Sequence, residues 1–141
     1  MCLCLRKIKI INFIRLAPLF KRERQFINLQ YGEVEEEINL EKNKNFELYS
    51  FNKIDLFNDL EGLMSILKNI DVFVTVSNST AHIAAAMGVK TLLICPKKSS
   101  TYFYWSNENN ITPWYKNVEI FQVNKSLEIT LNKIDKVLNS L

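Results

Sequence analysis

The chain alternates short apolar runs with segments of helical periodicity. Continuous runs rich in β-branched residues, at 71–76 and 91–95, are typical of strands that are buried on both faces of a parallel sheet. Other segments repeat apolar residues three and four positions apart, which indicates amphipathic helices. The pattern predicts strands at 26–31, 47–49, 71–76, 91–95 and 118–123, and helices at 33–38, 59–69, 81–87 and 127–141.

Strands and helices in this rhythm predict an α/β fold of three layers with a mainly parallel sheet. The runs at 71–76 and 91–95 are joined by a helix, so we expect a right-handed crossover between two neighbouring central strands. The apolar face of the helix at 59–69 is predicted to comprise Leu60, Leu63, Met64 and Leu67.

The first 24 residues carry a weaker pattern. Their apolar positions are interrupted by basic side chains such as Arg6 and Arg15, whereas a signal peptide keeps its charges before its apolar core. We expect an amphipathic lead-in strand and helix, with a basic membrane-surface helix as the alternative. The chain is therefore divided into a lead-in segment of unassigned structure at 1–24 and one domain at 25–141.

Composition excludes several classes of protein. A chain of 141 residues that is 48% hydrophobic suits one globular domain and not a disordered chain. A net charge of +3 is too small to predict nucleic-acid binding. Cys2, Cys4 and Cys95 are too few for a disulfide framework or a complete zinc site, so we expect reduced thiols in a cytoplasmic protein. No apolar stretch approaches the ~18 residues of a membrane span, and we expect no transmembrane segment.

A polar turn, Ser77-Asn78-Ser79-Thr80, joins the strand at 71–76 to an alanine-rich helix. Ligands of parallel sheets bind at the carboxyl ends of the strands. A helix N-terminus there offers unpaired backbone N–H groups to a phosphate. The glycine-rich Walker and dinucleotide patterns are absent. Since a helix cap alone explains the same residue types, the turn is consistent with phosphate binding and with simple capping.

His82 is the only histidine of the chain, and it falls in the first turn of that helix. We favour a role as hydrogen-bond donor to phosphate or ribose oxygens. The alternative is a histidine that is hydrogen-bonded within the protein at the start of the helix. Gly88 is predicted to end the helix, because glycine readily adopts the left-handed conformation that follows a helix C-terminus.

Aromatic residues gather in the loop at 97–115, and Lys97 and Lys98 open it. The aromatic side chains either pin the loop to the domain or form a wall for a bound base or sugar, and we assign Trp114 and Tyr115 to the core. The two lysines are either solvated or reach a diphosphate. The aromatic residues concerned are Tyr102, Phe103, Tyr104, Trp105, Trp114 and Tyr115.

Three blocks of sequence resemble a known family. Residues 71–91, DVFVTVSNSTAHIAAAMGVKT, are similar to the nucleotide-sugar-binding segment of heptosyltransferase-like glycosyltransferases, above all of members fused to tetratricopeptide repeats. FINLQYGE at 26–33 resembles the family's NLQYGD strand and turn. YW at 104–105, TPWY at 112–115 and VEIFQ at 118–122 resemble its third block, so the likeness covers about residues 25–123. It implies these nucleotide-sugar-binding residues: Gln30, Tyr31, Gly32, Ser77, Asn78, Ser79, Thr80 and His82.

The resemblance implies one half of a GT-B glycosyltransferase, an enzyme built of two Rossmann-like domains. This chain would be the C-terminal domain, which binds the nucleotide-diphosphate sugar as substrate. Neither a metal nor another cofactor is implied, because helix dipoles and side-chain donors neutralise the leaving diphosphate. Many relatives carry Asp-Thr or Asp-Ser where this chain has Ser77-Asn78, and the catalytic base is unknown.

A complete GT-B enzyme also needs an acceptor domain, and residues 1–24 do not resemble one. We expect a gene fragment, a truncated paralogue or half of a split enzyme that transfers no sugar alone. Its expected partners are the nucleotide sugar and either an acceptor domain on a separate chain or a second copy of itself. The alternative is a non-catalytic nucleotide-binding or interaction module.

Overall fold

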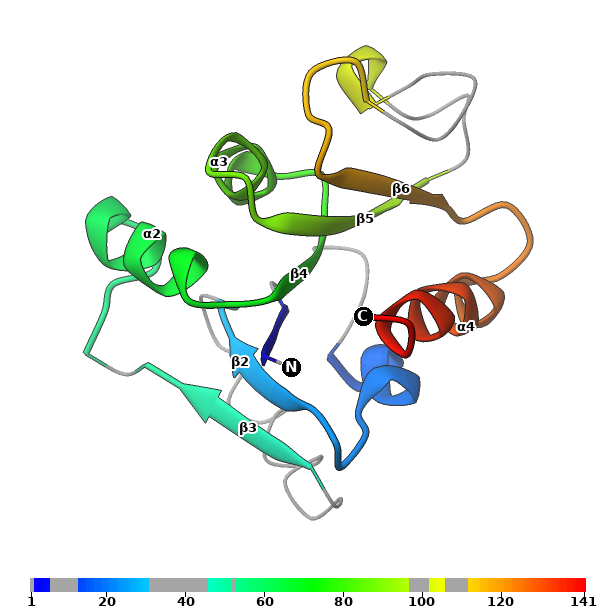
Figure 1. The fold of residues 1–141 in the computed structure, drawn as a ribbon, viewed down its shortest axis with the longest axis horizontal. Coiled ribbons are helices and arrows are strands. Elements are labelled where there is room, and N and C mark those ends of the chain that lie inside the picture. The colour runs from blue at the N-terminus through cyan, green and yellow to red at the C-terminus, as the bar shows by residue number, and fades with distance from the viewer. Residues whose placement is uncertain (1, 6–12, 31–45, 52, 97–101, 106–111) are drawn as a thin grey trace.

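The computed structural model describes residues 2–5, 13–30, 46–51, 53–96, 102–105 and 112–141. Six strands and five helical segments follow one another along these residues (Figure 1). The strands are β1 (Cys2–Leu5), β2 (Gln25–Asn28), β3 (Glu47–Ser50), β4 (Val72–Val76), β5 (Lys90–Cys95) and β6 (Val118–Gln122). The helices are α2 (Leu60–Lys68), α3 (Ser79–Ala86) and α4 (Leu127–Leu138), and the 3₁₀ segments are η1 (Phe13–Leu19) and η3 (Phe103–Trp105).

The six strands form one sheet in the order β3-β2-β1-β4-β5-β6. Each neighbouring pair is parallel. The acidic helix predicted at 33–38 lies outside the described residues. The α/β class and the mainly parallel sheet are confirmed, and the strand order is the one found in Rossmann-type dinucleotide-binding domains.

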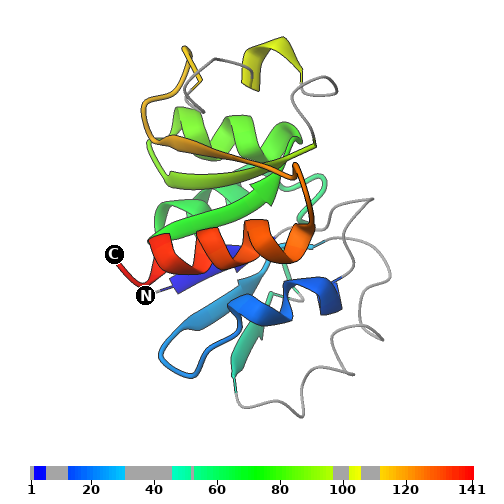
Figure 2. The ribbon, with the colours of Figure 1, turned by 90° about the vertical axis from the view of Figure 1, so that its right-hand side faces the viewer.

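Helical segments cover both faces of the sheet (Figure 2). On one face, η1 and α4 pack over a core that includes Phe26, Val74 and Leu92. On the other face, α2 and α3 enclose Phe73, and α3 also packs with Leu93. The three layers expected from the sequence are therefore present.

The strands β4 and β5 lie side by side in the interior of the sheet, as their continuous apolar character predicts. All but one residue in each of these strands is buried. Because neighbouring residues of a strand point to opposite faces, Phe73 packs with α2 and α3 while Val74 packs with η1 and α4.

The strand β1 pairs with both β2 and β4, which places it in the middle of the sheet. The segment η1 packs in the core beneath α4 through Leu16 and Leu19. Residues of the segment 1–24 thus belong to the same layered unit as the residues that follow, and the division at residue 24 has no counterpart in the sheet.

The buried face of α2 differs from the one predicted. Leu60 is 51% exposed and Met64 is 36% exposed, while the buried residues of α2 are Leu63, Ile66 and Leu67. Ile70, just beyond the helix, is buried with them. The actual stripe keeps the same helical spacing but begins three residues later.

The helix α3 ends in a Schellman motif, with Gly88 at a φ of 83° as predicted. The Gly88 N–H donates to the Ala85 carbonyl (3.1 Å), and the Val89 N–H donates to the Ala84 carbonyl (3.0 Å). In the same place, the Asn117 side chain donates to the carbonyls of Ala85 and Val89. These bonds satisfy backbone groups that a helix end leaves without partners.

A charged cluster joins the connection between β1 and β2 to α4. Arg24 is buried, and its guanidinium donates to Asp135 Oδ1 (2.8 Å), to the Leu19 carbonyl (3.2 Å) and to the Asn139 side chain. Lys21 Nζ lies 2.6 Å from Asp135 Oδ2. Burial raises the pKa of Asp135, but hydrogen bonds and charge from Lys21 and Arg24 outweigh it, so this pKa lies below its ordinary value.

Across the described segments, no helix is both long enough and apolar enough to cross a bilayer.

Candidate functional site

At the carboxyl edge of the sheet, the connections that follow the neighbouring strands β1 and β4 leave to opposite faces. From β1 the chain passes to η1 on one face, and from the neighbouring β4 it passes to α3 on the opposite face. Such a switch point leaves a crevice at the strand ends, where ligands of open parallel sheets bind. The N-terminus of α3 lies at this point, directly after β4.

Asn78 caps α3. Its side-chain oxygen accepts the Ala81 N–H (2.9 Å), and its amide nitrogen donates to Thr75 Oγ1 at the end of β4 (3.0 Å). The helix therefore begins at Ser79, two residues earlier than predicted. The cap uses one N–H of the first turn, and the N–H groups of Ser79 and Thr80 remain at the open end of the helix.

Ser77 has a structural role. Its hydroxyl accepts a hydrogen bond from Nε1 of Trp105 (2.9 Å), whose side chain is fully buried. Because Trp105 stacks on His82, this bond also supports the histidine. The side chains of Ser77 and Asn78 thus both form hydrogen bonds within the protein. The turn therefore does not offer all of its side chains to a ligand.

His82 is half-buried among aromatic rings. Its ring stacks on Trp105 at 4.4 Å between centroids and 24° between planes, and Tyr104 packs edge-on. Nδ1 lies 3.1 Å from the Tyr115 hydroxyl. Burial lowers the pKa of His82 below its ordinary value, which favours the neutral ring near pH 7. When the Tyr115 hydroxyl donates to Nδ1, Nε2 carries the hydrogen and is a donor.

Two buried polar side chains at this edge have no hydrogen-bond partner among the described residues. Thr80 Oγ1, in the first turn of α3, belongs to a residue with 0% exposure. Both polar atoms of the Gln30 side chain, after β2, are also unpartnered, and this residue is 4% exposed. A buried polar group without a partner costs stability, so each such group is a candidate position for a ligand, an ion or a bound water.

Gln30 and Thr80 follow strands that are separated only by β1. With about 4.8 Å between neighbouring strands, the two strand ends are roughly 10 Å apart. Both residues were predicted from the sequence as binding residues. Their burial and their lack of hydrogen-bond partners could not be predicted from it. The sequence also gave no sign that Thr75 and Tyr115 would support Asn78 and His82.

The other predicted site residues divide into two groups. Ser79 is exposed at the start of α3. Tyr31, Gly32, Lys97 and Lys98 lie outside the described residues. One cavity in the described part of the chain lies along β6 and another lies beside Asp71, and none of the predicted site residues lines either of them.

The aromatic loop is only partly core. Trp105 is fully buried and Tyr115 packs against the same cluster, as expected for Tyr115. Trp114 is 66% exposed, so its assignment to the core is wrong. Its backbone N–H bonds to the Thr112 hydroxyl (3.2 Å), which holds the backbone while the indole faces solvent. Tyr102 and Phe103 are exposed as well.

Cys95 is a buried thiol, as predicted. Burial raises its pKa to about 12, so the thiolate that would be needed for nucleophilic chemistry is disfavoured at neutral pH. The described residues contain no group of three or more histidine, cysteine or acidic side chains that could hold a metal ion.

Replacing Ser77 with alanine is expected to lower the free energy of unfolding by about 1–3 kcal/mol, because it leaves the buried Trp105 N–H without an acceptor. Chemical denaturation followed by tryptophan fluorescence measures the change. The matched control is Ser79→Ala, which removes an exposed hydroxyl two residues further along the chain. It should change the free energy of unfolding by less than about 0.5 kcal/mol. Equal effects of the two substitutions would contradict the structural role of Ser77.

The fold and this edge define a parallel α/β domain of Rossmann type. No protein-family model matches the chain, and no solved structure matches it significantly. The chain is similar to Protein FlbA of Caulobacter vibrioides, with 32% identity over 97 residues. The match covers 68% of this chain but 16% of FlbA, so the chain spans only a small part of that relative's length.

Proposed function

We propose that this chain binds the diphosphate group of a nucleotide sugar at the N-terminus of α3, as the donor-binding domain of a metal-independent glycosyltransferase. The observation that carries the proposal is the buried hydroxyl of Thr80, which has no hydrogen-bond partner in the described part of the chain and lies in the first turn of a helix that starts at the switch point of the sheet. Backbone N–H groups and the helix dipole favour an anion at that place.

Charge and hydrogen bonding around the helix start support an anionic ligand. None of the hydrogen bonds described for the side chains of His82, Ser77 and Asn78 involves a carboxylate. The His82 ring is held by Trp105 and Tyr115, so its remaining nitrogen is available as a fixed donor. Gln30, two strands away, adds amide groups suited to a ribose, base or sugar.

Sugar transfer needs an acceptor held close to the anomeric carbon, together with a base. The site as described supplies donors for a leaving diphosphate and no carboxylate base. We therefore propose that the chain acts in the cytoplasm together with an acceptor domain and transfers no sugar alone. A non-catalytic nucleotide-binding module is the second candidate, and the missing base at the described site favours it.

The ligand class is tested by thermal shift with UDP, GDP, ADP and their sugars, each against the corresponding nucleoside monophosphate. A diphosphate that binds the folded state should raise the melting temperature, and a monophosphate should raise it less. A sugar-transfer assay separates the two candidates. Robust transfer by the isolated chain would contradict the need for an acceptor domain, and no stabilisation by any diphosphate would contradict the binding proposal.

Replacing Thr80 with valine separates binding from stability. The substitution keeps the shape of the side chain and removes a buried hydroxyl that has no partner, so the free protein should be unchanged or more stable by about 1 kcal/mol. Diphosphate affinity should fall at least several-fold, because the ligand loses that donor. Denaturation and calorimetry measure the two quantities. A loss of stability without a loss of affinity would show that the hydroxyl serves the fold alone.

Replacing His82 with phenylalanine tests the proposed donor. The new ring can keep the stack on Trp105, whereas the nitrogen atoms are lost. Calorimetry should show diphosphate binding that is weaker by about 1–3 kcal/mol. The control is Tyr115→Phe, which removes the bond to Nδ1 but leaves the histidine and should have a smaller effect. Unchanged affinity in His82→Phe would remove His82 from the site.

A further inference from the structure

The strand β6 is the last strand in the described sheet order and has a partner, β5, on one side. The Val123 N–H donates to the Cys95 carbonyl (2.9 Å), which fixes the alternation of backbone groups along β6. The residues whose backbone groups point away from β5 are therefore Val118, Ile120 and Gln122. The Gln122 carbonyl already accepts hydrogen bonds from the Asn124 N–H (3.1 Å) and the Thr130 hydroxyl (3.4 Å), which leaves the Gln122 N–H for an added strand. Such an outward row of N–H and C=O groups can pair with another strand.

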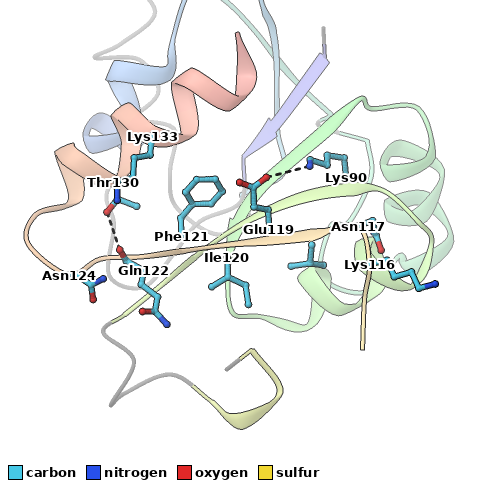
Figure 3. Close-up of a pocket in the computed structure, with 11 residues that line it drawn as sticks. Lys90, Lys116, Asn117, Glu119, Ile120, Phe121, Gln122, Asn124, Thr130 and Lys133 are labelled. Carbon is cyan, nitrogen blue, oxygen red and sulfur yellow. Dashed lines mark hydrogen bonds and ion pairs between the residues drawn. The ribbon is translucent and has the colours of Figure 1, made fainter. Parts of the chain in front are cut away.

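A groove of about 530 Å³ runs along this edge (Figure 3). It extends from the residues that precede β6 to the first turns of α4, so it follows the whole strand. It is lined by residues from β5, β6 and α4 and from the segments next to β6, and Lys116, Glu119, Gln122, Thr130 and Lys133 are polar examples. The groove lies on a different part of the sheet from the proposed diphosphate site at the start of α3.

The groove carries an excess of positive charge. Three lysines and one glutamate line it, and the glutamate, Glu119, lies 3.4 Å from Nζ of Lys90. The other two lysines, Lys116 and Lys133, are exposed and form no ion pair with a described residue. An occupant with carboxylates would complement the two remaining charges.

The strand itself carries one charged side chain, Glu119, and its last carbonyl is capped by Asn124 and Thr130, but it has no other common protection against pairing. Exposed edge strands commonly contain lysine, proline or a bulge that prevents the addition of another strand. The five residues of β6, Val-Glu-Ile-Phe-Gln, contain no lysine and no proline, and their register with β5 continues without interruption. The lysines of the groove stand beside the strand and not on it.

We propose that the outer edge of β6 binds an extended acidic segment of a partner protein by strand addition. Backbone hydrogen bonds to Val118, to Ile120 and to the N–H of Gln122 supply the pairing, and carboxylates of the segment meet Lys116 and Lys133. A second copy of this chain is a poorer occupant, because pairing β6 with itself would bring two cationic grooves together.

The test uses the 141-residue chain and a fluorescent peptide of alternating valine and glutamate, followed by fluorescence anisotropy. We expect binding that weakens with added salt, and no binding of the matched valine–lysine peptide. Lys116→Glu together with Lys133→Glu should weaken binding about tenfold. The control is Lys136→Glu, an exposed position of α4 outside the groove, which should leave the affinity unchanged.

Backbone pairing is tested separately from charge. Gln122→Pro removes an outward N–H and leaves the ladder with β5, so it should weaken binding of the peptide. Two peptides are compared, one N-methylated at its odd-numbered residues and the other at its even-numbered residues. Methylation of the N–H groups that face β6 should abolish binding, and methylation of the N–H groups that face away should preserve it. If Gln122→Pro unfolds the chain, the N-methylated peptides decide the question.

Three results of the binding assay would overturn the proposal. These are the absence of binding by the valine–glutamate peptide, equal affinity for single-stranded oligothymidylate, and equal affinity of both N-methylated peptides. Light scattering that shows a dimer disrupted by the lysine reversals would also overturn it, by assigning the edge to a second copy of the chain.

Discussion

Replacing Phe73 with alanine is expected to lower the free energy of unfolding by about 3–5 kcal/mol. Phe73 lies in β4 with 0% exposure and fills the space between the sheet and the helices α2 and α3. Truncation removes the ring from a close-packed core and leaves a cavity that neighbouring elements can only partly close. Urea denaturation followed by circular dichroism measures the loss.

The control for Phe73 is Phe57→Ala, because the Phe57 ring is 70% exposed. It removes the same chemical group and should change the free energy of unfolding by less than about 1 kcal/mol. Similar losses in the two variants would contradict the central position of β4 in the core.

Replacing Asp135 with alanine is the second substitution with a large expected effect, about 3 kcal/mol of lost stability. It leaves the Arg24 guanidinium buried without its anion. The expected loss stays at the low end for buried pairs, because Arg24 keeps its bonds to the Leu19 carbonyl and the Asn139 side chain. Glu128→Ala, at an exposed position of the same helix, is the control and should be nearly neutral.

The same cluster gives a pH dependence. The pKa of Asp135 in the folded protein lies below its ordinary value of 3.8 because Lys21 and Arg24 outweigh the cost of burial. The stabilisation is therefore complete above about pH 4 and is lost as the pH falls through the folded pKa. Denaturation curves between neutral pH and pH 3 should show a steeper fall for the wild type than for Asp135→Ala. Parallel falls would contradict the role of the cluster.

The unit β4-α3-β5 could be predicted from the sequence because its signals are local. Apolar runs mark strands buried on both faces, Asn78 and the residues around it mark a helix start, and Gly88 marks its end. A strand and a helix were expected within residues 1–24, but the pattern did not predict where β1 lies in the sheet. Its place between β2 and β4 is set by pairing with strands far along the chain, which periodicity does not report.

The helix α2 shows a limit of periodicity itself. The stripe that starts at Leu60 and the stripe that starts at Leu63 have identical spacing, so the sequence permits both. Packing against the sheet selects the second, which ends at Ile70. The pattern fixes the kind of element, and tertiary contacts fix which face is buried.

The position of the candidate site along the chain was predicted from the sequence, but the roles of its individual residues were not. The turn before α3 was identified from its residue types, yet Ser77 and Asn78 proved to be occupied within the protein. The contact of His82 with Tyr115 joins positions 33 residues apart, and no spacing rule predicts it. Buried polar atoms without a described hydrogen-bond partner, such as Thr80 Oγ1, can be identified only when the packed structure is known.

The proposed binding of a diphosphate at the N-terminus of α3 can be tested residue by residue by titrating the ¹⁵N-labelled chain with UDP and following backbone amide chemical shifts. We predict the largest shifts at Ser79 and Thr80, whose N–H groups lie at the open end of the helix, with smaller shifts at Gln30. Shifts confined to β6 and its groove, or no shifts at all, would contradict the proposed binding.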